Sequence, residues 1–364
     1  MIHNVLFITG HDPDAERKVD LHFMALHLCD SGHKVSFITL GSSLIGHVLG
    51  KSPLVKNPNR WIAASRIKKM FWYPLIHPMK VRWEFLKPLT SFAFSFYPYF
   101  FPLHELQKNG PFDVIVIESG AGLALVPRLK NLYPHARFIY SVSDRLSRLN
   151  VPDIIYSFEQ KALPLFDLIR VPSPLMISDY PDHAKVCYIP HGIERALFDK
   201  QYPSPYLSDK NAISIGDSLF DPQSISILAH HFPEWTFHLF GERARLDHKL
   251  ANVIEHGETR FEDIIPYICH ADIGLALYKN APDADYLSHS SLRMIQYSYC
   301  KLPIVTPHFS AHDRDHAFGY EIEDRDNLIH AFSNALHYGC HSIPVTDIQD
   351  WKHVSSQIFE SELF

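Results

Sequence analysis

The sequence contains few cysteines, and their spacing does not point to metal or disulfide chemistry. The five cysteines are scattered and form neither a CxxC pair nor a Cys/His group with ligand spacing, which is typical of buried thiols in a reducing compartment. Long apolar runs are also missing. No stretch approaches the ~20 apolar residues of a membrane-spanning helix, and the run at 5–8 is too short for the core of a signal peptide. We therefore expect a cytoplasmic protein.

An excess of positive charge is missing as well. The 34 Lys and Arg residues are outnumbered by 40 Asp and Glu residues, which gives a net charge of −6 and disfavours a nucleic-acid-binding protein. Neither a GxGxxG fingerprint followed by an acidic residue nor a GxxxxGK[ST] loop occurs. These absences disfavour a nicotinamide-dependent enzyme and leave no P-loop.

Runs of apolar and β-branched residues alternate with longer helical patterns in both halves of the chain. They predict strands at 5–9, 34–40, 113–118, 138–142, 168–171 and 186–189 in the first half, and at 212–215, 236–240, 253–256, 273–277 and 303–306 in the second. Near-continuous apolar strands separated by helices are typical of parallel sheets covered on both faces.

Two such sets, in a chain long enough for two ordinary domains, predict an α/β protein with two Rossmann-like, doubly wound parallel-sheet domains. We place the first domain at 1–195 and the second at 208–345, because the stretch 198–210 contains the Pro, Ser and Asp residues of a linker. In such a pair we expect the ligand in an interdomain cleft that faces the carboxyl ends of the strands.

Polar residues follow the predicted strands where each strand ends. In the first half they include His11, Glu118-Ser119 and Ser143-Asp144, and in the second half the segment 216–222, Glu258 and Tyr278. This pattern is typical of an enzyme whose site lies at the strand ends.

The segment 286–297 and the following 301–307 look like a ligand-binding helix start that leads into a buried strand. Ser290 and Ser291 stand where an apolar helix begins, so hydroxyls, backbone N–H groups and the positive end of the helix dipole would face an anion such as a diphosphate. Arg293 adds a fixed positive charge, and Gln296 lies on the same flank of the helix. An ordinary Ser-capped amphipathic helix remains the alternative.

Segments spread over most of the chain resemble those of the xanthan-type, or GumK-type, β-glucuronosyltransferases. They are 11–28, 113–126, 138–151, 215–222 and 286–307, together with Pro190-His191-Gly192 and Asp350-Trp351. The resemblance implies a GT-B fold, with a final helix at 346–364 that crosses back to the first domain. It also implies an inverting, metal-independent enzyme that moves a glucuronosyl group from UDP-glucuronate to a polyprenyl-diphosphate-linked oligosaccharide.

The resemblance assigns the catalytic base to Asp144, which would take a proton from the acceptor hydroxyl. The alternative is that Asp144 caps a helix running toward Asn150. Glu118 is the second candidate carboxylate: it either positions the acceptor sugar or caps the turn at Gly120. His11 and Ser119 are further candidates on the acceptor side.

On the donor side, the resemblance assigns the pocket to nine residues, namely Ser218, Phe220, Glu258, Tyr278, Ser290, Ser291, Leu292, Arg293 and Gln296. Arg293 stands where the family carries a Lys, and Ser218 replaces a bulkier apolar residue. An Arg can bind a sugar carboxylate or a phosphate with two parallel hydrogen bonds, so an acidic donor remains compatible. Phe220, Tyr278 and Leu292 could equally be ordinary core residues.

Two DxD triplets, at 12–14 and 283–285, have the form that some transferases use to hold a metal. Such triplets arise readily in loops, and the first contains Pro13, so we interpret it as a turn. We predict no metal site and no cofactor beyond the UDP-sugar donor.

A partner surface is predicted at 51–103. Between Lys51 and Lys87 there are nine Lys or Arg residues and one acidic residue, interleaved with aromatics that include Trp83, and an aromatic run follows at 91–101. Cationic groups beside interfacial aromatics suit an anionic lipid surface, so we expect peripheral attachment to the inner face of the cell membrane. Single-stranded nucleic acid is disfavoured for lack of a stacking-fold signature, and a helix pair packed inside the domain is the alternative.

Two hypotheses follow. The first is a membrane-associated inverting glycosyltransferase that uses a UDP-sugar, with glucuronic acid favoured, in exopolysaccharide or capsule assembly. The second is a nucleotide-sugar-binding or epimerase-like protein on the same scaffold, because a fold does not fix the chemistry.

Overall fold

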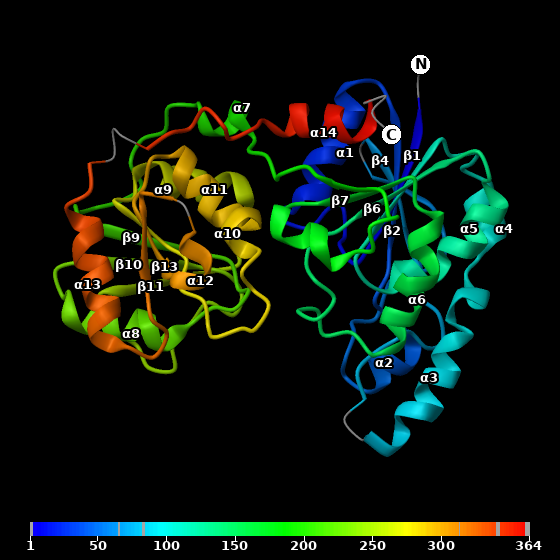
Figure 1. The fold of residues 1–364 in the computed structure, drawn as a ribbon, viewed down its shortest axis with the longest axis horizontal. Helices are drawn as coiled ribbons and strands as arrows, with labels where there is room; N and C mark the ends of the chain where they lie inside the picture. Colours follow the sequence, from blue (N-terminus) through cyan, green and yellow to red (C-terminus); the bar gives the residue numbers. More distant parts are fainter. Residues whose placement is uncertain (1–2, 65, 82–83, 313, 340–342, 361–364) are drawn as a thin grey trace. The chain divides into compact units, whose positions relative to one another are not determined.

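The computed structural model describes residues 3–64, 66–81, 84–312, 314–339 and 343–360. The chain divides into two compact units. Unit 1 comprises Met1–Ala15, Asp20–Ile189 and Ser355–Phe364, and unit 2 comprises Glu16–Val19 and Pro190–Val354. Each unit is built around its own sheet (Figure 1).

Unit 1 contains an eight-stranded sheet in the order β3-β4-β2-β1-β5-β6-β7-β8. All described pairings are parallel except β3 with β4. The strands are β1 (Asn4–Thr9), β2 (Lys34–Thr39), β3 (Ile62–Ala64), β4 (Ile67–Phe71), β5 (Val114–Glu118), β6 (Arg137–Ser141), β7 (Leu168–Val171) and β8 (Val186–Tyr188). Strands β1, β5 and β6 are buried along almost their whole length, as parallel strands covered on both faces must be.

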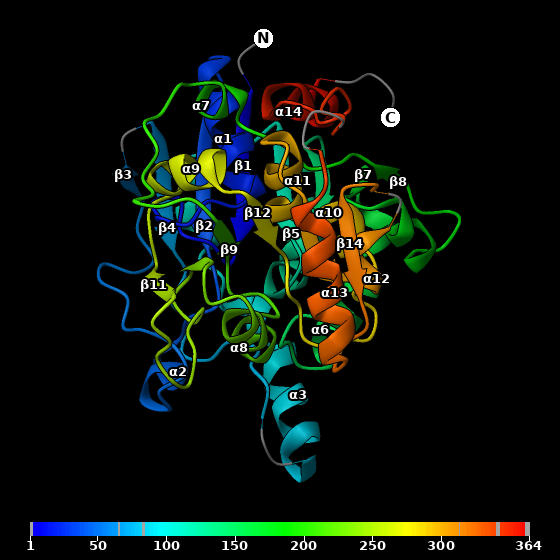
Figure 2. The ribbon, with the colours of Figure 1, turned by 90° about the vertical axis from the view of Figure 1, so that its left-hand side faces the viewer.

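The helices of unit 1 are α1 (Asp20–Asp30), α2 (Leu44–Val48), α3 (Lys87–Ser95), α4 (Leu103–Gln107), α5 (Val126–Leu132) and α6 (Ile154–Ala162), with 3-10 turns η1 (Glu84–Leu86), η2 (Tyr97–Phe100), η3 (Ala121–Leu125), η4 (Leu163–Leu165) and η5 (Pro174–Asp179). Helix α1 covers one face of the sheet, and α5 and α6 cover the other (Figure 1). Helix α3 projects away from the sheet in both views (Figure 2).

Unit 2 contains a six-stranded parallel sheet in the order β11-β10-β9-β12-β13-β14. Its strands are β9 (Asn211–Ile215), β10 (Thr236–Phe240), β11 (Val253–Gly257), β12 (Ile273–Leu275), β13 (Ile304–Pro307) and β14 (Ala317–Tyr320). The chain reverses its direction of sheet growth between β9 and β12, and this switch point is where doubly wound sheets bind ligands.

The helices of unit 2 are α7 (Arg195–Phe198), α8 (Pro222–His231), α9 (Phe261–His270), α10 (Leu287–Ser290), α11 (Leu292–Tyr299), α12 (His308–Ala311) and α13 (Arg325–Leu336). Helices α8 and α13 pack on one face of the sheet, and α9 and α11 lie on the other (Figure 1). Ile225, Leu228 and Phe332 lie within the core between the first pair and the sheet.

The last helix, α14 (Trp351–Phe359), contributes to both units. Its first residues belong to unit 2, where the Trp351 N–H donates to the carbonyl of Ile193 at 3.0 Å. Its last residues belong to unit 1, where the ring of Phe359 lies 6.2 Å from that of Phe7. Within the described residues, no helix combines the length and apolar character that a bilayer crossing requires.

All eleven predicted strands are present, and their bounds differ from the prediction by at most two residues. Three strands were not predicted, namely β3, β4 and β14. Strand β4 contains Lys68 and Lys69, and β3 and β14 are short, so neither an apolar run nor a long alternation marks them. The α/β class with two doubly wound parallel sheets is confirmed.

Candidate functional site

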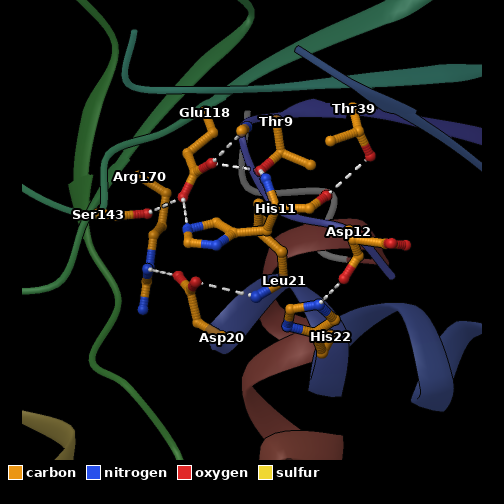
Figure 3. A network of polar contacts seen from close by, with 11 residues as sticks. Thr9, His11, Asp12, Asp20, Leu21, His22, Thr39, Glu118, Ser143 and Arg170 are labelled. Carbon is orange, nitrogen blue, oxygen red and sulfur yellow. Dashed lines mark hydrogen bonds and ion pairs between the residues drawn. The ribbon is translucent and has the colours of Figure 1, made fainter. Parts of the chain in front are cut away.

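The predicted acceptor-side residues lie at the carboxyl edge of the unit 1 sheet. Strands β1, β5, β6 and β7 are consecutive neighbours, so the segments that follow them meet at one edge. Thr9 and Glu118 end β1 and β5, and Ser143 follows β6 by two residues. These side chains form one polar network (Figure 3).

Glu118 is the centre of this network. Its Oε2 accepts from the hydroxyl of Thr9 and from the backbone N–H of Gly10 at 3.3 Å, while its Oε1 accepts from the hydroxyl of Ser143 at 3.0 Å and lies 3.4 Å from Nε2 of His11. Four donors from two other strand ends therefore converge on one buried carboxylate. No described contact joins it to the turn at Gly120.

These donors keep Glu118 charged. Burial by itself would raise the pKa of the Glu118 carboxyl, but the hydrogen bonds and charge of His11 and the hydroxyls of Thr9 and Ser143 outweigh it, so that the pKa is lowered from its ordinary value. The group is thus a fixed anion whose oxygens are committed to the protein.

A buried ion pair lies beside the network. The guanidinium of Arg170 on β7 donates through Nη1 to Asp20 at 3.0 Å and through Nε to the carbonyl of Ile189 at 2.8 Å. Both side chains are almost completely buried. Burial raises the pKa of Asp20 in spite of the opposing effect of Arg170, and Glu118 nearby raises it further. Figure 3 shows this pair next to His11 and Glu118.

Asp144 lies three residues beyond the end of β6 and is half-buried. The segment 146–150 forms turns, and the next helix, α6, begins at Ile154 with Asp153 as its N-cap. The structure therefore removes the helix-capping alternative for Asp144. Both neighbours of Asp144 have anchored side chains: Ser143 on Glu118, and Arg145 on Asp179 at 2.6 Å.

His11 and Ser119 occupy different surroundings. The His11 side chain is 44% exposed, and its backbone is held by the hydroxyls of Thr9 and Thr39. The Ser119 hydroxyl instead lies 3.4 Å from the hydroxyl of Tyr140, a fully buried residue. His11 and Glu118 are thus brought together, whereas Ser119 belongs to a separate hydrogen-bond network.

The donor-side candidates of unit 2 gather around the start of α11. Ser291 is its N-cap, and its hydroxyl accepts from the N–H of Met294 at 3.5 Å. The predicted cap is confirmed, but the helical segment is broken at Ser291, so that α10 and α11 are separate helices. The Ser290 hydroxyl donates to the carbonyl of Tyr286 at 3.1 Å.

Arg293, the second residue of α11, is only 8% exposed. Its Nη2 donates to the carbonyl of Ser218 at 3.3 Å, and its guanidinium carbon lies 5.0 Å from the centre of the Tyr278 ring. Its Nη1 is buried and has no hydrogen-bond partner among the described residues. A buried cationic donor without a partner is costly, so this atom is suited to a ligand anion.

The loop after β9 fits closely around this guanidinium. Gly216 has φ +84°, and a Cβ atom at this position would lie 3.0 Å from Nη2 of Arg293. Glycine is required here both for its backbone conformation and for the space that it leaves to the arginine.

Tyr278 links the start of α11 to the loop after β9. Its hydroxyl lies 2.7 Å from that of Ser291, and its backbone pairs with that of Phe220 in an isolated bridge. Phe220 is part of the unit 2 core, as the alternative interpretation allowed. Ser218, Phe220, Tyr278, Ser291 and Arg293 are therefore connected by direct contacts.

Tyr297, which was not predicted, fixes α11 to the sheet. Its hydroxyl donates to the carbonyl of Ile213 and accepts from the N–H of Ile215, both at 3.1 Å. Its ring fills the space beside Gly274 on β12, where no Cβ would fit. Helix α11 and the end of β9 are thus held in register.

The other donor-side candidates have no described side-chain contact with the cluster formed by Ser218, Phe220, Tyr278, Ser291 and Arg293. Gln296 is buried and Leu292 is half-buried on α11. Glu258 is exposed after β11, the edge strand that lies two strands away from β9.

Sequence reasoning missed the roles of Thr9, Ser143 and Tyr297. The first two follow apolar strands as small hydroxyl residues, which is a weak signal, and their shared partner emerges only from the strand order. Tyr297 appears in the sequence as one more aromatic residue of an amphipathic helix.

The first DxD triplet forms a turn, as predicted. The N–H of Asp14 donates to Oδ1 of Asp12 at 3.1 Å, and Nζ of Lys69 pairs with both carboxylates. Across the described ranges, His, Cys, Asp and Glu side chains form no group of three or more that could hold a metal ion.

The region 51–103 divides into two parts. Residues 62–64 and 67–71 form β3 and β4, where Lys69 pairs with acidic residues. Trp72 and Tyr97 are packed against each other in the core with ring centroids 4.3 Å apart. In α3 and η2, by contrast, several large apolar side chains are exposed, namely Leu89, Phe92, Phe96, Tyr99 and Phe100. Trp83 lies outside the described residues.

Comparison with known proteins explains this architecture. The family model for the N-terminal domain of glucuronosyltransferase GumK matches residues 7–172. The chain is also 30% identical, over 334 residues, to the UDP-glucuronate:glycolipid 2-beta-glucuronosyltransferase of Xanthomonas campestris pv. campestris, and the match covers 91% of this chain and 83% of that protein. The chain belongs to the GumK glucuronosyltransferase family.

Solved structures related to this GumK-family chain are glycosyltransferases of the GT-B fold. Trehalose-6-phosphate synthase OtsA superposes with a TM-score of 0.61 at 11% identity, covering 97% of this chain and 95% of that one. A UDP-forming trehalose-phosphate synthase from Burkholderia xenovorans gives 0.57 at 12% identity, covering 97% and 95%. A glycosyltransferase from Rickettsia africae ESF-5 gives 0.55 at 14% identity, covering 98% and 94%. At such identities these similarities establish the fold alone.

The protein is therefore a GT-B glycosyltransferase of the GumK family. Family membership rests on the sequence relationship, and the fold on the two parallel-sheet units and their structural neighbours. The hypothesis of a binding protein or epimerase without transferase activity is not supported.

Proposed function

We propose that this enzyme transfers a glucuronosyl group, with inversion, from UDP-glucuronate to a lipid-linked oligosaccharide in exopolysaccharide or capsule assembly. The curated relative carries UDP-glucuronate and a glycolipid in its name. The observation that carries the proposal is the buried guanidinium of Arg293, whose Nη1 has no hydrogen-bond partner among the described residues. A UDP-sugar acid supplies diphosphate and carboxylate oxygens, which are the acceptors that such a donor needs.

In the proposed reaction, Asp144 takes the proton from one acceptor hydroxyl while that oxygen attacks the anomeric carbon. The bond between this carbon and the diphosphate breaks, and UDP leaves with the bonding electron pair. Arg293 and the groups around the N-terminus of α11, including Ser290 and Ser291, stabilise the negative charge that grows on the leaving diphosphate. Attack from the side opposite to UDP inverts the anomeric configuration.

The remaining candidates have supporting roles in this proposal. Tyr278 and Phe220 border the nucleotide-sugar site, together with Ser218, Leu292, Gln296 and Glu258. His11 and Ser119 serve the acceptor side, and Glu118 supports that side through its contacts with Thr9, His11 and Ser143. Arg293 and the helix N-terminus supply positive charge at the diphosphate, so the proposed reaction proceeds without a metal ion, and we expect turnover to survive treatment with EDTA.

Substitution of the base tests the proposal. Asp144→Asn should lower turnover by several orders of magnitude while UDP still binds, because the variant loses the proton acceptor but keeps the donor site. Asp153→Asn is the matched control, since Asp153 is exposed on the same β6–α6 connection and its side chain makes no capping bond. Full activity of Asp144→Asn would overturn the proposed mechanism.

The donor sugar is tested at Arg293. Arg293→Ala should weaken binding of UDP-glucuronate more than that of UDP-glucose if the guanidinium binds the sugar carboxylate, and equally if it binds phosphate. Arg245→Ala, an exposed arginine of the same unit, controls for loss of charge. Equal binding of both donors by the native protein would contradict the acidic-donor assignment.

We also propose that the exposed apolar face of α3 and η2 attaches the enzyme to the inner face of the cell membrane. Leu89, Phe92 and Phe96 recur at helical spacing, and Tyr99 and Phe100 follow on η2. Exposed apolar side chains gathered on one face suit the boundary between headgroups and acyl chains, where a lipid-linked acceptor is presented.

A further inference from the structure

The loop that carries Asp144 is anchored on both sides of that residue. The Ser143 hydroxyl donates to Oε1 of Glu118 at 3.0 Å. Arg145 donates through Nε to Asp179 at 2.6 Å and through Nη2 to the carbonyl of Leu175 at 3.0 Å. A residue between two anchored neighbours has little freedom in its backbone, and therefore in where its side chain begins.

The anchor at Ser143 depends on the carboxylate of Glu118, which is itself held in position by several hydrogen-bond donors. Glu118 is 7% exposed and receives donors from Thr9 and Gly10 on one oxygen, and from His11 and Ser143 on the other. Figure 3 shows these groups converging on it from the ends of β1 and β6. A carboxylate used in this way is a poor general base, because proton uptake would break the hydrogen bonds that hold it.

We propose that Glu118 is a positioning residue for Asp144 and acts through the hydroxyl of Ser143. Its charge holds three strand ends of unit 1 together, so that the start of the Asp144 loop is fixed relative to β1 and His11. This inference rests on the proposed role of Asp144 as the base. It assigns to Glu118 a function other than acceptor binding or turn capping, and to Ser143 a function that the sequence did not reveal.

The chain offers a close control for this role. Ser141, the last residue of β6 and two residues before Ser143, is buried, and its hydroxyl has no hydrogen-bond partner among the described residues. Ser141→Ala therefore removes the same atom from a neighbouring position in the chain without removing a link to Glu118. A comparison of the two alanine variants separates the hydrogen bond from the loss of a buried hydroxyl.

The experiment measures kcat and KM for both substrates, with the folded fraction obtained from the stoichiometry of UDP binding. Ser143→Ala should lower kcat per folded molecule roughly 10- to 100-fold, with KM for the UDP-sugar within about twofold of the native value, because a displaced base slows the chemical step more than it weakens donor binding. Ser143→Thr keeps the hydroxyl and should restore most of kcat. Ser141→Ala should match the native enzyme.

Glu118→Gln should lower kcat at least as much as Ser143→Ala. An amide offers one acceptor oxygen where the carboxylate offers two, and it carries no charge. Equal kcat values for Ser143→Ala and Ser141→Ala, or a Ser143→Thr variant no better than Ser143→Ala, would overturn the inference. If these variants behave as expected but Asp144→Asn retains turnover, the base has been assigned wrongly; if only Asp144→Asn is inactive, the base stands and the positioning role fails.

Discussion

The guanidinium of Arg293 lies over the ring of Tyr278, with its central carbon 5.0 Å from the ring centroid. The tyrosine holds this cation with the face of its ring and holds Ser291, the N-cap of α11, with its hydroxyl. Removal of the hydroxyl and removal of the ring are therefore separate perturbations of one site.

Tyr278→Phe should weaken UDP binding only about threefold, because the ring face that carries the cation–π contact remains, whereas Tyr278→Leu should weaken it more than tenfold. Calorimetric titration with UDP measures both affinities. Equal losses in the two variants would show that the hydroxyl, and not the ring, matters for the donor site.

Gly216→Ala should weaken UDP binding as well as the fold. A Cβ atom at Gly216 would press on Arg293, and its φ of +84° is unfavourable for alanine, with a cost of roughly 1 kcal/mol. Gly32→Ala is the matched control, since Gly32 has the same φ but no atom within 4 Å of the added Cβ. We expect similar shifts in the melting temperature, and a loss of UDP affinity only in Gly216→Ala. Unchanged UDP affinity in Gly216→Ala would mean that Arg293 can shift to accommodate the added Cβ atom.

Unit 2 should lose stability as the pH falls from about 6.5 toward 4. Burial, and then the charge of His256 at 3.0 Å, lowers the pKa of His238 to about 4. The unfolded chain takes up this proton near pH 6.5 and the folded chain does not, so stability is fully present above 6.5 and is lost as the pH drops through this window, by at most about 3 kcal/mol. Asn211, Tyr206 and Tyr267 also contact His238.

Thermal unfolding followed across this pH range tests the prediction. His238→Gln should flatten the pH dependence, whereas His135→Gln, a substitution at an exposed histidine of unit 1, should leave it unchanged. An unaltered slope in His238→Gln would assign the acid sensitivity to another group.

Glu118 should give a second pH dependence in a lower window. Because its folded pKa lies below the ordinary carboxyl value of about 4.3, its contribution to stability is present above that value and is lost as the pH falls through the folded pKa. The difference in melting temperature between the native protein and Glu118→Gln should therefore shrink below about pH 4. A difference that stays constant with pH would indicate that the charge of Glu118 contributes nothing to stability.

Membrane attachment should depend on the exposed face of α3. Leu89→Ser should reduce binding to vesicles that contain anionic lipid, because a large apolar side chain no longer enters the lipid surface. Leu207→Ser, the same change at a fully exposed leucine of unit 2, should have no effect. We also expect binding of the native protein to fall as salt rises. Vesicle binding that responds to neither variant would reject this face as the attachment surface.

The sequence predicted the strands well, because long buried runs of Val, Ile and Leu leave a clear local signal. It could not predict β4, where two lysines stand at adjacent positions and Lys69 pairs with Asp12 and Asp14, which lie far away in the chain. Local pattern also failed at Glu118, since its four donors come from two other strand ends whose adjacency depends on the order β1-β5-β6.

The local structure at the start of α11 was easier to predict than the network around Glu118. Ser290, Ser291 and Arg293 lie within four consecutive residues, so the helix that they begin is itself the sequence signal. The unpartnered Nη1 of Arg293 could not be foreseen, because it depends on how the loop after β9 and Tyr278 surround the guanidinium.

The contact between Tyr297 and Gly274 limits how this family can vary. The ring of Tyr297 fills the space beside Gly274, and its hydroxyl bridges Ile213 and Ile215, so no room is left for a side chain at 274. The two positions should therefore change together among homologous sequences: alanine or serine at 274 should be found only where 297 carries a smaller residue, and the double substitution should be better tolerated than Gly274→Ala alone.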